Sequence, residues 1–354
     1  MKAWAVVGHG VPLEAIERPA REPRGTEVLV DVTHAGVCHS DLYFWRGYYE
    51  LGGGKRINLA DRGAVLPLAP GHEIVGRVAA LGPDASGVAV GDQVIVFPWL
   101  GCGQCERCRS GSDNLCDKPN ALGVKQDGGF GSQVVVPHAR YLVDVGELDP
   151  ALAATCACSG ITVYSAIKKI LPIPPDEPIV LFGAGGLGLA AISTLVALGH
   201  KNIVSVDISA DKREAALAMG ATKAVDGASD DLPVWLLEAT GGQVKGAIDF
   251  VNKSSTAQVG LECLVKGGRL VLIGVAGGEL VISLGEMIFR PRSVQGSLTG
   301  NPQDLRDVVA LARSGKLKPI PLTILSRDQA NAALTMLQKG QVSGRIVLVG
   351  APAQ

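Results

Sequence analysis

Aromatic side chains and runs of like charge are scarce in this 354-residue sequence. It has only four Trp, five Tyr and six Phe, and its 33 basic residues are balanced by 34 acidic ones, for a net charge of -1. No run of five or more like charges occurs. Nucleic acids and anionic membrane surfaces require strongly basic patches. We therefore expect neither as a partner, and expect a small neutral or weakly charged substrate instead.

No secretion signal is expected, because Met1–Val7 leads directly into a strand-like alternation without a long apolar segment or a small-residue cleavage site. The stretch Ile179–Gly199 carries no charged residue, and by length alone it could cross a membrane. Four glycines between residues 183 and 188 interrupt it. This pattern predicts a buried strand, a tight turn and a helix. We therefore expect a cytoplasmic protein without a membrane partner.

The length and the hydrophobic pattern favour two domains. Residues 1 to about 150 contain short β segments separated by Gly, Pro and Asp, which is typical of an irregular β barrel. These are expected at Glu27–Thr33, Ile74–Ala80, Gln93–Phe97 and Ser132–Val136. From about 160 to 298, apolar strands alternate with helices, which predicts a doubly wound parallel sheet. These elements are expected at Ile179–Phe182, Ala190–Leu198, Ile203–Val206, Asp211–Met219, Ala247–Val251, Ser255–Cys263 and Arg269–Ile273. A helix over Gln303–Ser314 follows, and then a strand over Arg345–Val349 that we expect to return to the first domain.

A glycine-rich turn follows the predicted strand Ile179–Phe182 and opens the predicted helix. Its residues are Gly183-Ala184-Gly185-Gly186-Leu187-Gly188. In this context such a turn binds a dinucleotide pyrophosphate at the helix N-terminus. Asp207 ends the next strand, where its carboxylate can bind ribose hydroxyls and repel a 2′-phosphate. Because Ile208 and Ser209 follow, without an immediate arginine, NAD is favoured over NADP. The alternative is a turn that serves only helix–sheet packing.

Four of the eight cysteines lie within fifteen residues, in a C-x2-C-x2-C-x7-C pattern formed by Cys102, Cys105, Cys108 and Cys116. In a chain without a secretion signal this crowding favours metal binding over disulfides. Four thiolates complete a closed tetrahedral zinc site, which would stabilise a loop with little hydrophobic core. An iron–sulfur cluster is the alternative, although its fourth cysteine usually precedes proline at a shorter spacing.

Three further residues suggest a second metal with an open position. Cys38 and His72 occur in Cys-His-Ser-Asp and Gly-His-Glu segments, and Cys158 is a third candidate. Two thiolates and one imidazole leave room for a water or alcohol oxygen on zinc, which is typical of a catalytic site. Asp41 is suited to orient the His72 ring. Taken singly, each residue also fits a structural role as a buried thiol or a hydrogen-bonded core histidine.

In their order along the chain, these motifs resemble those of the zinc-dependent alcohol dehydrogenases of the medium-chain dehydrogenase/reductase superfamily. The resemblance covers essentially the whole sequence, from Cys38-His39-Ser40-Asp41 through Gly71-His72-Glu73, the four-cysteine lobe and Cys158–Tyr164 to the glycine turn. It implies a GroES-like β-rich catalytic domain (residues 1–158 and 299–354) and a Rossmann NAD-binding domain (159–298). It also implies two zinc ions per chain, NAD, and interconversion of primary or secondary alcohols with aldehydes or ketones by hydride transfer at a zinc-bound alkoxide. A homodimer or homotetramer is expected, as in the family.

The resemblance also implies roles for individual residues. The ligands of the catalytic zinc would be Cys38, His72 and Cys158, with Glu73 behind the metal as an occasional fourth ligand. Ser40 would receive the substrate proton. The groups that contact the cofactor would be His39 and Arg345 at the pyrophosphate, Thr162 and Leu187 at the nicotinamide ring, and Lys212 near the adenosine ribose. Trp45 and Trp99 fall where relatives place aromatic walls of the substrate pocket.

Two departures from the family pattern stand out. Many relatives have a histidine three residues after the proton-accepting Ser or Thr, but here the residue is Tyr43, which is a poor base near neutral pH. The proton would then leave through a cofactor ribose hydroxyl and water. The segment Tyr49–Leu66 is longer than in the yeast-type enzymes, and it can rim the substrate cleft, meet another subunit or be an inert loop.

Other activities of the superfamily are disfavoured by single residues. Polyol dehydrogenases usually have Glu in place of Cys158, cinnamyl-type reductases usually replace Asp207 to accept NADP, and quinone reductases lack the zinc ligands. From a different class of protein, the alternative is a non-catalytic NAD-binding protein. Such a protein has no need for an open metal position, so Cys38, His72 and Cys158 argue against it.

Overall fold

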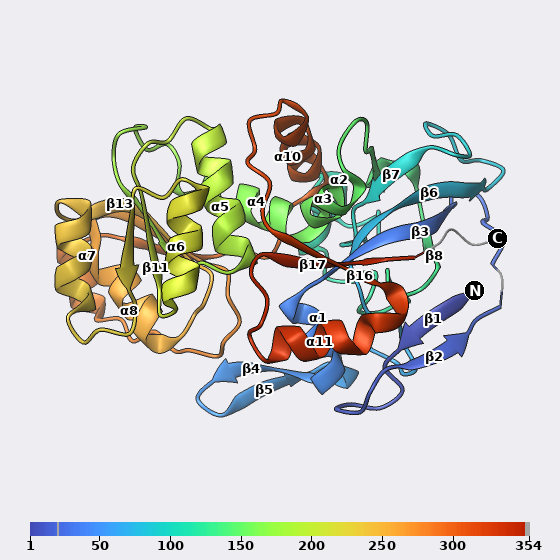
Figure 1. The fold of residues 1–354 in the computed structure, drawn as a ribbon, viewed down its shortest axis with the longest axis horizontal. Helices are drawn as coiled ribbons and strands as arrows, with labels where there is room; N and C mark the ends of the chain where they lie inside the picture. Colours follow the sequence, from blue (N-terminus) through green and yellow to red (C-terminus); the bar gives the residue numbers. More distant parts are fainter. Residues whose placement is uncertain (20, 351–354) are drawn as a thin grey trace.

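Two β-sheets organise the chain, which the computed structural model describes for residues 1–19 and 21–350. In Figure 1 a seven-stranded sheet lies on the right and a six-stranded sheet on the left, with helix α4 (Ile161–Ile170) between them. Ile161 packs in the core of the first sheet, whereas Ala166 packs in the core of the second. Helix α4 therefore ties the two parts together.

The seven-stranded sheet has the order β16-β17-β3-β6-β7-β9, with β8 paired to β3. Its strands are β3 (Val28–Val37), β6 (Glu73–Leu81), β7 (Gln93–Val96), β8 (Gln133–Val136), β9 (Leu142–Asp144), β16 (Leu322–Ser326) and β17 (Arg345–Val349). Valine-rich β3 is mostly buried because it pairs with strands on both sides. The prediction that the last strand returns to the first domain is confirmed, since β17 pairs antiparallel with β3.

The six-stranded sheet is entirely parallel and has the order β12-β11-β10-β13-β14-β15. Its strands are β10 (Ile179–Phe182), β11 (Ile203–Asp207), β12 (Lys223–Asp226), β13 (Val244–Asp249), β14 (Leu264–Leu272) and β15 (Ser293–Gly296). The strand order reverses between β10 and β13, and the crevice at that point is where doubly wound sheets bind ligands. The predicted Rossmann topology is therefore confirmed.

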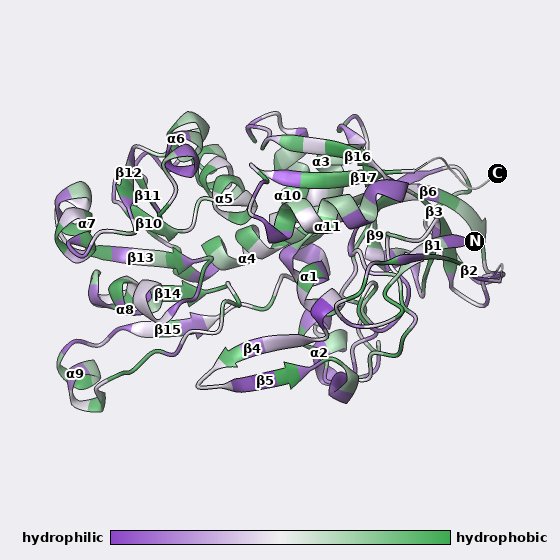
Figure 2. Cartoon of the chain, turned by 60° about the horizontal axis from the view of Figure 1, so that its bottom comes forward, coloured by the Kyte–Doolittle hydropathy of each residue, from purple (hydrophilic) through white to green (hydrophobic). Residues whose placement is uncertain are grey.

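Helices cover both faces of this parallel sheet. They are α4, α5 (Gly186–Ala197), α6 (Ala210–Met219), α7 (Leu232–Thr240) and α8 (Ser254–Glu262). The short helix α9 (Leu284–Phe289) buries none of its residues and projects away from the sheet (Figure 2). Ile179 and Leu181 of β10 point into a core shared with α4, α5 and α6, whereas Val180 and Phe182 point into a core shared with α7 and α8. Because both faces are buried, the strand is apolar throughout.

One continuous helical stretch, Pro150–Ile170, is long and apolar enough to cross a membrane. It comprises α3 (Pro150–Thr155), a π-helical turn (Cys156–Gly160) and α4. In its most apolar window 78% of the residues are buried inside the protein. It is therefore explained as a core helix of the fold.

The remaining elements frame the seven-stranded sheet. They are β1 (Lys2–Ala5) with β2 (Glu14–Glu17), α1 (His39–Arg46), the β4–β5 hairpin (Tyr48–Gly52 and Lys55–Asn58), α2 (Glu106–Arg109), α10 (Pro302–Arg313) and α11 (Ala330–Gln338). Helix α10 matches the helix predicted at Gln303–Ser314 and begins at a capping box formed by Asn301 and Asp304. The β4–β5 hairpin projects from the body of the protein beside α1, and charged residues lie along β5 (Figure 2).

Candidate active site and metal centres

A single buried carboxylate, Asp41, joins two of the predicted metal-binding segments. Cys38 is the N-cap of α1, and its backbone N–H donates to Asp41 Oδ2 over 2.8 Å. The backbone N–H of Gly71 donates to Asp41 Oδ1 over 3.0 Å, and the same oxygen lies 3.4 Å from His72 Nδ1. The structure therefore places Asp41 where the sequence analysis expected an orienting carboxylate, behind the His72 ring.

The predicted catalytic ligands converge from three separate segments. One ligand atom from each of Cys38, His72, Glu73 and Cys158 lies within 4.8 Å of the others. Because Asp41 faces Nδ1 of His72, Nε2 is the ring atom left for a metal, and this buried atom has no hydrogen-bond partner among the described residues. Two sulfurs and an unpartnered imidazole nitrogen fit zinc.

The two thiols of this cluster are not equivalent. The hydrogen bond that Cys158 donates to Cys38 holds the pKa of Cys38 well below the usual range of a thiol, although burial opposes this shift. The same hydrogen bond raises the pKa of Cys158, and burial adds to the effect. Cys158 lies in the π-helical turn between α3 and α4, and such turns often occur at functional sites.

Glu73 lies behind the cluster, fully buried and against the guanidinium of Arg345. Gly36 is paired with Glu73 across β3 and β6, and a Cβ at Gly36 would come within 2.0 Å of Glu73 Oε2. Arg345 also packs on the glycine turn, because a Cβ at Gly186 would lie 2.6 Å from Arg345 Cδ. Arg345 thus connects the metal cluster with the predicted dinucleotide site.

The glycine turn has the backbone geometry that close approach of a phosphate requires. Gly183 has φ +94°, and a Cβ at Gly188 would collide with the carbonyl of Gly183 at 1.9 Å. Gly185 is the N-cap of α5 and has open space where a Cβ would point. The helix N-terminus is therefore accessible to an anion.

Several predicted cofactor contacts lie around this turn. Burial lowers the pKa of His39, and the positive charges of Arg345 and Lys212 lower it further, against the opposing effect of Cys38. Thr162 is buried and lies close enough to Cys158 to hydrogen-bond with it. Leu187 packs partly buried against the core beneath the turn.

Asp207 is the last residue of β11, as predicted, and its carboxylate is held by backbone groups. Ala184 N–H donates to Oδ2 over 2.7 Å, and Ser209 N–H donates to Oδ1 over 2.9 Å. Arg213 was not predicted from the sequence, and its Nη1 donates to the Asp207 carbonyl over 2.9 Å. Helical side chains point toward the helix N-terminus, which for α6 lies at the end of β11, so an arginine in the first turns of α6 could have been expected there.

The four-cysteine lobe forms a second compact cluster. Its sulfurs lie 3.4 to 4.0 Å apart in the pairs Cys105–Cys108, Cys105–Cys116 and Cys102–Cys108. Zn–S bonds of about 2.3 Å in a tetrahedron separate sulfurs by about 3.8 Å, so the cluster fits zinc. Backbone N–H groups of Gln104 and Cys105 lower the pKa of Cys102 to about 6, which favours the thiolate.

Two half-buried tyrosines, Tyr49 and Tyr43, lie near Ser40. Burial raises the pKa of Tyr49 above its usual value of 10, and a hydrogen bond with Ser40 partly offsets this. Burial also raises the pKa of Tyr43, whose ring lies 4.8 Å from that of Tyr49. Both phenols therefore stay protonated near neutral pH.

The two tryptophans predicted to line the substrate pocket occupy different surroundings. The Trp99 ring lies 5.1 Å from the His72 ring, next to the metal cluster. The indole N–H of Trp45 donates to the Val11 carbonyl over 2.5 Å. Only Trp99 is therefore joined to the cluster by a contact among the described residues.

Comparison with known proteins places this geometry in a family. Residues 24–147 match the alcohol dehydrogenase GroES-like domain, and residues 186–314 match the zinc-binding dehydrogenase domain. The chain is 36% identical over 356 residues to an NAD-dependent alcohol dehydrogenase from Sulfurisphaera tokodaii, covering 99% of this chain and 100% of the relative. The chain belongs to the GroES-like, zinc-binding alcohol dehydrogenase family. The predicted family and fold class are therefore confirmed.

The family includes members with different specificities. The structure of the alcohol dehydrogenase from Aeropyrum pernix aligns with a TM-score of 0.88 at 30% identity, covering 99% of this chain and 100% of that one. A D-arabinose 1-dehydrogenase (NADP(+)) from Saccharolobus solfataricus is 34% identical over 340 residues, covering 95% of this chain and 94% of the relative. Substrate and cofactor choice within the family must therefore come from individual side chains.

Proposed function

We propose that the chain is a zinc-dependent, NAD-linked alcohol dehydrogenase that interconverts primary or secondary alcohols with aldehydes or ketones. The observation that carries this proposal is the convergence of Cys38, His72 and Cys158, joined through Glu73 and Arg345 to the glycine turn of a Rossmann sheet. When bound, zinc would polarise the substrate oxygen and NAD would accept a hydride. Two thiolates and one imidazole leave a position open for substrate, which a purely structural site does not need.

The domains follow from this arrangement. We assign residues 1–158 and 299–354 to the GroES-like catalytic domain and residues 159–298 to the NAD-binding domain. Support comes from the pairing of β17 with β3 and from the separate hydrophobic cores of the two sheets. The four-cysteine lobe would hold a structural zinc, and its buried Asp113, which accepts from Tyr141 Oη over 2.7 Å, anchors it to the catalytic domain.

Ser40 is the residue that we assign to the substrate proton. Its hydroxyl lies in the first turn of α1, two residues after Cys38, and within hydrogen-bonding range of Tyr49. Because Tyr43 and Tyr49 remain protonated, neither acts as the terminal base. Tyr49 would instead hold the orientation of the Ser40 hydroxyl, with the Tyr43 ring packed against that of Tyr49.

The cofactor would be held mainly by groups of the Rossmann sheet. The N-terminus of α5 at Gly185 would bind the pyrophosphate, with His39 and Arg345 contributing from the catalytic domain. Asp207 would bind the adenosine ribose with Lys212 nearby, and Thr162 and Leu187 would position the nicotinamide ring. Trp99 would form an apolar wall of the substrate pocket, and Trp45 would lie farther out.

The β4–β5 hairpin is best assigned to the rim of the substrate cleft. A Cβ at Gly52 would lie 2.7 Å from Glu279 Cγ and 3.0 Å from the Gly277 carbonyl, so the hairpin tip bears on a loop of the Rossmann sheet. The same hairpin carries Tyr49, next to Ser40. It therefore spans from the proton-accepting serine to the opposite side of the cleft.

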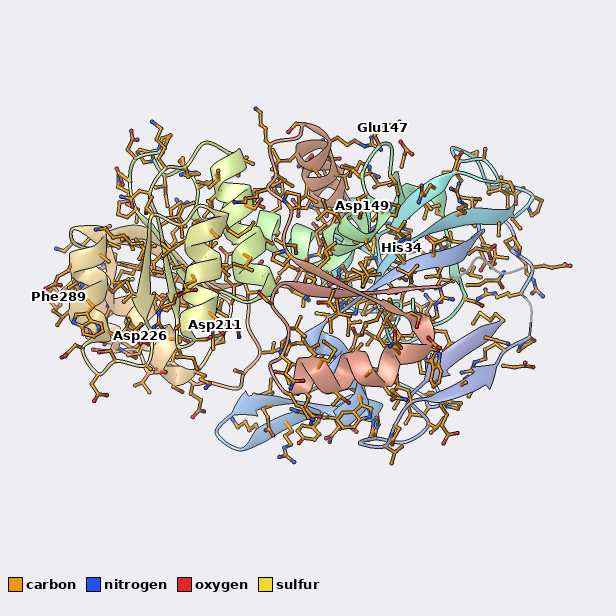
Figure 3. The ribbon with its side chains drawn as sticks, in the orientation of Figure 1. His34, Glu147, Asp149, Asp211, Asp226 and Phe289 are labelled. Carbon is orange, nitrogen blue, oxygen red and sulfur yellow. The ribbon has the colours of Figure 1, made fainter. Side chains whose placement is uncertain are left out.

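We further propose that the enzyme is a cytoplasmic homodimer or homotetramer. Strand β15 is the edge of the parallel sheet, and an unpaired edge can pair with a second copy. Next to it, α9 exposes Leu284, Ile288 and Phe289 at 82%, 76% and 78%. Figure 3 shows Phe289 at the outer edge of this part of the protein. Large exposed apolar patches usually mark protein interfaces.

The test is NADH formation from NAD across a panel of primary, secondary and aromatic alcohols, repeated after dialysis against a chelator and after zinc is restored. Chelator-sensitive activity that returns with zinc is expected. If no alcohol is turned over while zinc content and NAD binding are intact, the proposal is wrong and the non-catalytic alternative is favoured.

A further inference from the structure

Two neighbouring strands of the Rossmann sheet each end in an aspartate. The parallel register places Asp207 of β11 beside Asp226 of β12. Both oxygens of Asp207 accept backbone N–H groups, as described above. Asp226 uses Oδ1 to accept from the N–H of Ala228 over 2.9 Å, and its Oδ2 lies 3.1 Å from Arg213 Nη2.

Arg213 is the cation between the backbone carbonyl of Asp207 and the carboxylate of Asp226. From helix α6 it reaches the Asp207 carbonyl with Nη1 and Asp226 with Nη2. The side chain of Arg213 is only 21% exposed, so the guanidinium has little freedom to turn toward another anion while it is paired with Asp226. An arginine therefore contacts the backbone of the residue whose carboxylate we assign to the adenosine ribose.

We propose that Asp226 is a second determinant of NAD selectivity. By pairing with Arg213, it withholds from a 2′-phosphate the guanidinium that would otherwise bind it beside Asp207. The inference rests on the proposed function in one respect, which is that the adenosine ribose lies at Asp207.

The charges explain why substitution of one aspartate alone does not allow a 2′-phosphate to bind. A phosphate monoester carries close to two negative charges at neutral pH, and a planar guanidinium binds it well through paired hydrogen bonds. With both aspartates present, the phosphate would meet two carboxylates and one paired guanidinium. Removing Asp207 alone leaves Arg213 engaged by Asp226. Neutralising Asp226 as well leaves Arg213 free, next to Lys212 on the same helix.

Substitutions of Asp207 and Asp226 are therefore expected to be coupled in their effect on 2′-phosphate binding. Asp226→Asn alone has little effect on 2′-phosphate binding, because Asp207 still repels the phosphate. In an Asp207→Ser background, Asp226→Asn strongly increases the affinity for a 2′-phosphate. Asparagine keeps an Oδ1 acceptor for the N–H of Ala228, so the local turn is preserved. A double-mutant cycle measures the coupling.

The experiment is isothermal calorimetry with two probes, adenosine 2′,5′-bisphosphate and 5′-AMP. The Asp207→Ser/Asp226→Asn enzyme is expected to bind the bisphosphate about tenfold or more tightly than Asp207→Ser, as a new charge-assisted hydrogen bond would give. Affinity for 5′-AMP stays the same in both. Adding Arg213→Gln removes the gain. In kinetics, the ratio of kcat/KM for NADP over NAD rises through a lower KM for NADP.

Asp211→Asn in the Asp207→Ser background is the matched control. Asp211 is exposed at the start of α6, and its replacement by Asn changes the net charge by the same amount as Asp226→Asn. Asp226 lies instead at the end of β12, where it pairs with Arg213 (Figure 3). The proposal is overturned if the control gives the same gain, if Asp226→Asn gives none, or if the gain survives Arg213→Gln. If 5′-AMP binds neither the unmodified enzyme nor any of the variants, the placement of the ribose at Asp207 is wrong, and the inference is wrong with it.

Discussion

Replacement of Asp41 by Asn tests how the catalytic metal site is held. The carboxylate accepts from the N–H groups of Cys38 and Gly71 and lies beside His72 Nδ1. Asparagine is nearly the same size but has one acceptor oxygen. If that oxygen faces Gly71 and His72, the amide NH2 group points at the N–H of Cys38. One buried N–H then lacks a partner, which costs about 1–3 kcal/mol of folding free energy.

The larger effect is expected on the metal. Loss of a carboxylate behind a ligating histidine typically weakens metal binding about 10–100-fold, or about 1.4–2.7 kcal/mol. The four-cysteine lobe does not depend on Asp41, so the second zinc in the same molecule serves as an internal reference. After dialysis against a chelator of intermediate affinity, Asp41→Asn should retain about one zinc per chain where the unmodified enzyme retains two.

The assay combines metal analysis, chelator competition and urea unfolding. Asp84→Asn, an exposed aspartate with the same change in charge, is the control and should behave like the unmodified enzyme. If Asp41→Asn keeps both zinc ions through the same dialysis and gives the same competition curve, Asp41 does not position His72 and the reasoning is refuted.

Three further outcomes are expected. Ser40→Ala should lower turnover about 100-fold or more while leaving NAD affinity nearly intact, and unchanged turnover would contradict its role as proton acceptor. Gly52→Ala should raise the KM for alcohols more than Gly54→Ala does. Both positions have positive φ, but of the two only Gly52 lies against Glu279. Equal KM values would show that the hairpin does not border the substrate cleft. Burial lowers the pKa of His200 from its usual value of 6.5, so the unfolded chain takes up the proton first and the free energy of unfolding should fall as the pH drops below about 6.5. Urea titrations of His200→Gln between pH 5 and 8 should show a flatter dependence.

Sequence reasoning succeeds here where local pattern and chemistry coincide. The strand Ile179–Phe182 has the predicted bounds because an apolar run buried on both faces is bounded by a turn that only glycine can form. Strand β12 was missed, since Lys223–Asp226 lies at the sheet edge and contains only two apolar residues.

The site also contains some features that the sequence predicts and others that depend on the fold. The pairing of His72 with Asp41 follows from the chemistry of a metal-binding histidine, and the sequence analysis expected it. The π-helical turn that carries Cys158 has no sequence signature, because it depends on packing between two sheets. The ion pair between Arg213 and Asp226 joins different elements, so only the fold reveals it.

The metal cluster and the dinucleotide turn are joined by a steric arrangement as well as by charge. Gly36 leaves the space that Glu73 fills, and Gly186 leaves the space that Arg345 fills. These two glycines lie 150 positions apart, one in strand β3 and the other at the start of helix α5, yet each is needed for the same buried contact between Glu73 and Arg345. Since Arg345 is in the last strand, the chain must return to the first sheet before this contact can form. The geometry of the cleft therefore depends on docking of the two parts, and a side chain at either glycine would disturb metal and cofactor sites together.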